Sequence, residues 1–221
     1  MQPSNEAMEI KKATENDIPF LVETIVAAEK SGTSVFSYAT LFEVNENKVK
    51  EVLTEILSED IVGQELCVSD FLIAYVDGIP AGAVCGWIEG AEGPSNILKS
   101  NVLMFGFGKE HFGKVLSKAH LMEPLTISRE EGSLQLESIY VSEKFRGMGI
   151  VKALIDAHLA SQKGKNPEVS KAQIILAKDN DSALRAYEKA GFNMVLEKFQ
   201  PNAEILKYLP TQHKILMEKQ F

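Results

Sequence analysis

Arg146, Gly147 and Gly149 stand where an apolar, strand-like run gives way to a helix-like run, in the stretch LESIYVSEKFRGMGIVK. The first turn of a helix leaves backbone N–H groups without intrahelical partners, and the helix dipole adds partial positive charge there. Glycines let the backbone approach an anion closely, and an arginine adds a guanidinium at the rim. These residues therefore predict a diphosphate site. A glycine-eased turn without a ligand is the alternative that the turn alone leaves open.

The turn differs from two common phosphate-binding motifs. No Lys-Ser or Lys-Thr pair follows it, as a Walker A loop requires, and the third glycine of a dinucleotide fingerprint is missing. A general nucleotide-binding module remains open as an interpretation.

The elements that must position this turn alternate between strands and helices. Strands are expected at 8–13, within 71–90, and at 133–141, 172–177, 192–199 and 214–221, and helices at 14–30, 44–60, 149–163 and 180–190. This order predicts an α/β (α+β) fold, with a mixed, largely antiparallel central sheet and helices on both faces. Residues 91–131 interrupt the rhythm and form an insertion between the third and fourth strands. We expect one domain over 1–221.

Local signals support several boundaries. Thr14 and Asp17 have the spacing of a capping box at a helix start. Asp77-Gly78 between two apolar runs predicts a hairpin turn that needs positive φ. Gly164 and the proline that follows it at 167 are expected to stop the helix that starts at the glycine turn.

Composition excludes some function classes. The chain has 221 residues, 45% of them hydrophobic and 24% charged, which is typical of soluble globular proteins. A net charge of −8 argues against nucleic-acid binding.

The segment MQPSNEAMEI lacks the pattern of a secretion signal, and no apolar run is long enough to span a membrane, so we expect a cytoplasmic protein that binds no membrane. Cys67 and Cys85 are expected to be buried, reduced thiols.

Four blocks, in order, resemble the GNAT superfamily of acyl-CoA-dependent N-acetyltransferases. The glycine turn is similar to the family's Arg/Gln-x-x-Gly-x-Gly/Ala signature, and residues 180–192 resemble its Asn-x-x-Ala-x-x-x-Tyr-x-x-x-Gly-Phe pattern. Residues 71–90 resemble its second and third strands, and residues 10–25 its first strand and helix. Val151 departs from the pattern, because it occupies the last Gly/Ala position.

The resemblance implies acetyl-CoA as co-substrate, no metal, and a primary amine of a small molecule or peptide as acceptor. It implies that Glu137 is the general base and that Tyr187 is the general acid. Strand alternation groups Glu137 with Gln135 and Ile139 on one face. Asn180 would hydrogen-bond the pantetheine arm. The implied cofactor-binding residues are Ile139, Tyr140, Val141, Arg146, Gly147, Met148, Gly149, Ile150, Val151, Lys152 and Asn180.

Two function classes remain open. The first is an active N-acetyltransferase, which the combination of Glu137, Tyr187, Asn180 and Arg146 favours. The second is a catalytically weak or inactive CoA-binding or interaction protein with the same fold, which Val151 favours because its side chain could crowd the pyrophosphate. A nucleotide-binding module would leave Tyr187 and Asn180 unexplained.

The insertion 91–131 carries clustered aromatic and methionine side chains. Gly106, Gly108 and Gly113 interrupt it, so a single rigid helix is not expected. Its apolar side chains must bury against the same domain or against a second copy in a homodimer. The more specific hypothesis is that the insertion shapes the acceptor pocket, with Phe105 and Phe107 lining an apolar part of it.

Overall fold

The computed structural model describes residues 8–221, so most of the segment examined for a secretion signal lies outside the described residues. Seven strands form one sheet in the order β1-β2-β3-β4-β5-β7-β6. All neighbouring strands are antiparallel except β4 and β5, which confirms the predicted mixed sheet. The strands are β1 Met8–Lys12, β2 Phe71–Val76, β3 Ile79–Ile88, β4 Leu134–Val141, β5 Lys171–Ala177, β6 Asn193–Phe199 and β7 His213–Gln220.

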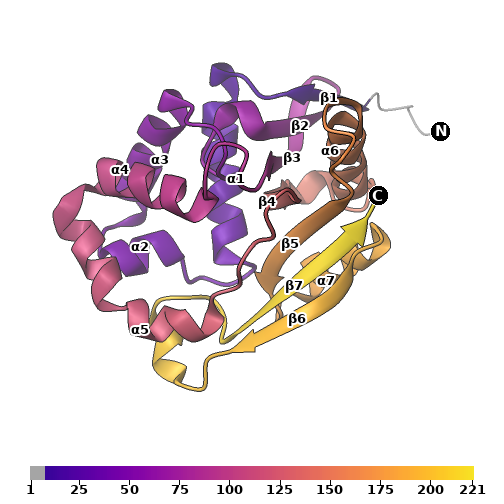
Figure 1. The fold of residues 1–221 in the computed structure, drawn as a ribbon. Coiled ribbons are helices and arrows are strands. Elements are labelled where there is room, and N and C mark those ends of the chain that lie inside the picture. Colours follow the sequence, from indigo (N-terminus) through magenta and orange to yellow (C-terminus); the bar gives the residue numbers. More distant parts are fainter. Residues whose placement is uncertain (1–7) are drawn as a thin grey trace.

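Helices cover both faces of the sheet, as predicted. The α-helices are α1 Ile18–Lys30, α2 Ser37–Phe42, α3 Glu46–Glu59, α4 Ser95–Ser117, α5 Ala119–Met122, α6 Ile150–Lys165 and α7 Asp181–Lys189. One apolar cluster joins α1 to α4 with β2 and β3, and a second joins α6 and α7 with β4, β5 and β7. Figure 1 shows α2, α3 and α4 gathered on one side of the molecule and β5, β7 and β6 on the other. No helix within residues 8–221 is long and apolar enough to cross a membrane.

The predicted local signals are present. Thr14 and Asp17 form the capping box before α1. Asp77 and Gly78 have φ of 50° and 78°, as the hairpin between β2 and β3 requires. Cys67 and Cys85 are free and buried. The helix α6 continues through Gly164 and ends at Lys165, two residues beyond the predicted end at 163.

A β-bulge in β4 changes which side chains share a face. Cys85 pairs with Glu137 and Ala83 with Tyr140, so two residues of β4 lie opposite one residue of β3. Ser138, at φ 49°, absorbs the extra residue. The prediction that Ile139 shares a face with Glu137 is therefore wrong, because Ile139 packs against the cluster under α6 and α7.

The insertion folds as helices that pack on α2 and α3. The long helix α4 is broken at Gly108, which has the non-helical angles φ 78° and ψ 161°, as expected for this glycine-rich segment. Phe107 is buried and stacks on Phe42 with ring centroids 3.9 Å apart. Phe105 is 78% exposed. The hypothesis that these two aromatics line a pocket is wrong, because one belongs to the core and the other faces solvent.

Candidate active site

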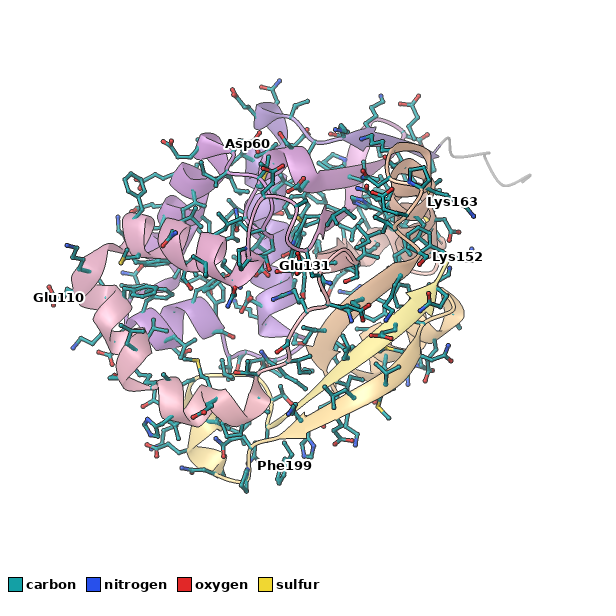
Figure 2. The ribbon with its side chains drawn as sticks, viewed as in Figure 1. Asp60, Glu110, Glu131, Lys152, Lys163 and Phe199 are labelled. Atoms are coloured by element: carbon teal, nitrogen blue, oxygen red, sulfur yellow. The ribbon has the colours of Figure 1, made fainter. Side chains whose placement is uncertain are left out.

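A cleft of about 1370 Å³ runs between α1, the splayed strands β4 and β5, and the first turn of α6. Every residue predicted to act in catalysis or cofactor binding lines it, except Met148, which is exposed. In Figure 2, Lys152 of α6 lies on the side of the molecule opposite Glu110 of α4. Lys152 is paired with Asp156 one turn along the same helix.

The glycine turn presents open backbone to this cleft. Gly147 and Gly149 have φ of 85° and 76°, and a Cβ built at either position would have no atom within 4 Å. Gly149 is the N-cap of α6, so the unpaired N–H groups of the first turn follow directly. Arg146 has a side chain that is 60% exposed beside the turn. The space, the donors and the guanidinium fit a diphosphate.

The strand β4 offers a free backbone edge next to the turn. Its parallel pairing with β5 is limited to Leu134↔Ala172 and Gln135↔Gln173, so the ladder ends before Glu137. A linear ligand with amide groups could pair with such an edge as an added strand does.

Two neighbours of this edge have structural contacts of their own. Asn180 caps α7 through its side-chain oxygen, and its amide nitrogen donates to the Ser31 hydroxyl at 3.2 Å. Val151 is half-buried and packs against the cluster under α6 and α7 while lining the cleft.

Glu137 projects from β4 into the cleft with its side chain only 17% exposed. Burial raises the pKa of Glu137 to about 7, although the charge of Arg129 acts to lower it. Arg129 donates through Nη2 to Glu137 Oε1 at 2.9 Å. A carboxyl group with a pKa near neutrality can accept a proton and release it again at physiological pH.

The insertion supplies the cations around this carboxylate. Arg129 also lies 3.8 Å from Glu65, and Lys99 of α4 forms an ion pair with the other oxygen of Glu65. Tyr38 donates to the same Glu65 oxygen at 3.3 Å. Burial acts to raise the pKa of Glu65, but Lys99 and Arg129 together hold it below its usual value. Glu65 therefore stays ionised and anchors both cations.

Tyr187 lies on α7 with 6% of its surface exposed and lines the same cleft. Burial, followed by the charge of Glu137, raises the pKa of Tyr187 above its usual value. Its phenol is therefore protonated at neutral pH and can donate a proton.

Sequence reasoning missed Glu65, Lys99 and Arg129. None of the three belongs to a motif, and solvent-facing charges give the same sequence signal. No spacing pattern could have found them, because their pairing depends on how the insertion docks.

Several solved structures with the same fold are described as acetyltransferases. A structure described as an acetyltransferase superposes with a TM-score of 0.58 at 21% identity, with 96% of this chain and 98% of that chain covered. An N-acetyltransferase from Staphylococcus aureus Mu50 gives a TM-score of 0.61 at 15% identity, covering 96% and 100%. The aminoglycoside acetyltransferase AAC(6')-Ib in complex with coenzyme A gives 0.50 at 17%, covering 97% and 95%. Identities this low show a shared fold.

Among curated proteins, none matches the chain by sequence. A family model does match, over residues 38–192, and it describes the acetyltransferase (GNAT) family. The match includes the glycine turn, Glu137 and Tyr187. The chain thus belongs to the GNAT acetyltransferase family.

Proposed function

We propose that the protein transfers an acetyl group from acetyl-CoA to a primary amine by direct attack in a ternary complex. The observation that carries this proposal is the placement of Glu137, with a pKa of about 7, and protonated Tyr187 along one cleft. A proton acceptor and a proton donor are the two groups that acyl transfer to an amine requires.

The cofactor side of the cleft supports the choice of acyl donor. Acetyl-CoA supplies an activated thioester on a long amide-containing arm that ends in a diphosphate. The N–H groups after Gly149, with the guanidinium of Arg146, fit the diphosphate. The free edge of β4 from Ile139 to Val141 fits the arm. The side chain of Val151 packs partly into the core, so it leaves the turn open.

The acceptor side supports an amine. An alkylammonium has a pKa near 10.4, so roughly one molecule in a thousand or fewer is the free nucleophile at neutral pH. Glu137 takes the proton that the amine must lose, directly or through water. Tyr187 donates a proton to the sulfur that leaves as the C–S bond breaks and the C–N bond forms. Arg129 keeps the pKa of Glu137 low enough for about half of the molecules to be ionised at neutral pH.

The test is an assay of CoA release, with thiol detection, over a panel of amines including amino acids, diamines, aminoglycosides and peptides. Glu137→Gln should lower kcat/KM most at neutral pH and less at high pH, where more acceptor is already deprotonated. Glu188→Gln, an exposed carboxylate next to Tyr187 in sequence, is the matched control and should leave the rate unchanged. Full turnover in Glu137→Gln on an identified acceptor would contradict the assigned role.

Acetyl-CoA binding without turnover of any amine would favour a non-catalytic protein of this fold. Titration calorimetry with acetyl-CoA separates that outcome from a loss of cofactor binding.

A further inference from the structure

A half-buried cation of the cleft, Lys214, has no direct partner among residues 8–221. Lys214 of β7 lines the cleft and is half-buried, and within residues 8–221 its ammonium makes no ion pair and no hydrogen bond. Two other cations that line the cleft are paired, Arg129 with Glu137 and Lys99 with Glu65. Glu29 of α1 also lines the cleft, but it forms no ion pair with Lys214.

The position of Lys214 is unfavourable for stability. It pairs directly across the strands with Lys198 of β6, and like charges directly opposite one another in an antiparallel pair are destabilising. Burial lowers the pKa of Lys214 from its usual value, although Glu29 acts to raise it. A desolvated charge without a counter-ion costs free energy, so a functional role is the physical reason to keep it.

Lys214 and Glu137 project from the same face of the sheet. Gln135 of β4 donates to Gln173 of β5 at 2.8 Å, and Gln173 donates to Glu218 of β7 at 2.7 Å, so these three side chains share a face. Glu137 is two residues from Gln135 and precedes the bulge, and Lys214 is four residues from Glu218 in an unbroken ladder. Alternation therefore places Glu137 and Lys214 on that face.

The two groups lie on opposite sides of the cleft. Strand β5 separates their strands, which sets the backbones at least ~10 Å apart. A small molecule can therefore contact both groups at once, with one end at Glu137 and the other at Lys214.

We propose that the acceptor amine also carries a carboxylate, as amino acids do, and that Lys214 binds this carboxylate while the amine meets Glu137. The inference rests on the proposed acetyl transfer and adds the class of acceptor. The bound carboxylate gives Lys214 a direct ion pair, which no side chain within residues 8–221 supplies. Simple amines and diamines would leave Lys214 unpaired and bind more weakly.

The experiment compares matched acceptors, lysine with cadaverine and ornithine with putrescine, which differ by one carboxylate. We expect Lys214→Met to raise KM for the two amino acids roughly 10- to 100-fold, the range of a charge-assisted hydrogen bond. KM for the diamines, and KM for acetyl-CoA, should stay within about twofold. Lys109→Met, which removes an exposed lysine of α4 that does not line the cleft, is the control and should change none of these values.

Equal effects of Lys214→Met on both acceptor classes, or no effect on either, would overturn the inference. CoA release with diamines but not with amino acids would also overturn it and leave acetyl transfer intact. Lys214→Arg should retain most of the amino-acid preference, which guards against a variant that merely misfolds.

A second measurement does not depend on turnover. The reaction products Nε-acetyl-lysine and N-acetylcadaverine are compared by thermal shift. The first should raise the Tm of the wild type but not of Lys214→Met, and the second should have the same effect on both proteins. Absence of CoA release with every amine, together with this product selectivity, would count against the proposed reaction and in favour of the carboxylate site. Equal Tm shifts in wild type and variant would count against the site.

Discussion

Replacing Arg129 with methionine should move the pH dependence of the reaction to higher pH. Arg129 donates to Glu137 at 2.9 Å, and the two side chains are only 20% and 17% exposed. Two unit charges 4 Å apart attract by about 4 kcal/mol at an effective dielectric constant of 20. Residual water and the second contact of Arg129 with Glu65 reduce this to roughly 2 kcal/mol, or about 1.5 pKa units.

Loss of Arg129 should raise the pKa of Glu137. Burial raises the pKa of Glu137 to about 7 in the wild type, with Arg129 acting to lower it. Without the cation the pKa should rise to roughly 8.5, so the ionised fraction at pH 7 falls from about one half to about one thirtieth. We expect kcat/KM to fall about 15-fold at pH 7 and by less than twofold at pH 9.5.

The assay is the ratio of kcat/KM between wild type and variant from pH 6 to 10, with one acceptor. Ionisation of the acceptor affects both proteins equally and cancels in the ratio. Arg185→Met removes a guanidinium that is 66% exposed and should give a ratio independent of pH. A pH-independent ratio for Arg129→Met would refute the reasoning, because it would show that Arg129 does not control ionisation of Glu137.

The same shift predicts a change in stability. An acid whose pKa is higher in the folded protein holds its proton longer there, so stability falls as pH rises from the unfolded value of about 4.3 through the folded value. Arg129→Met should enlarge this fall, and urea unfolding at pH 5 and pH 9 measures it.

Three further outcomes are expected. Gly149→Glu should abolish acetyl-CoA binding in titration calorimetry, because a negative side chain would fill the open space at the turn, whereas Gly132→Glu, at a similar positive φ and equally open, should bind normally. Tyr187→Phe should lower kcat about 10²- to 10⁴-fold with an unchanged Kd for acetyl-CoA. A variant with the kcat of the wild type would show that Tyr187 is not the general acid. Gly106→Ala should lower the free energy of unfolding by about 1–3 kcal/mol and so lower the Tm, since the new Cβ would lie 2.7 Å from a side chain of α3. Gly113→Ala, whose new Cβ contacts nothing, should raise the Tm.

Local signals made much of the framework predictable. The glycine turn, the hairpin at Asp77-Gly78 and the capping box at Thr14 each depend on a few adjacent residues whose backbone preferences are strong. The resemblance then led to the roles expected of Glu137 and Tyr187, and both residues line the cleft.

The remaining features depend on contacts between distant segments. The bulge at Ser138 arises from a mismatch with β3, and a strict two-residue alternation cannot anticipate it. The helix α2 has only six residues, too few for a clear period. Lys99 and Arg129 are partners of Glu65 and Glu137 only because the insertion folds back over the sheet, and nothing adjacent in sequence encodes that pairing.

The docking of the insertion also has a consequence for folding. The chain has one tryptophan, Trp87, which is buried on β3, and the guanidinium of Arg129 lies over its ring at 5.4 Å. Its indole N–H donates to Glu89 at 3.2 Å. The emission of this single fluorophore therefore responds to the step at which the insertion closes onto the sheet, the same step that gives Glu137 its cation. During refolding, the change in tryptophan emission and the recovery of enzyme activity should have the same rate, because both follow when the insertion closes onto the sheet.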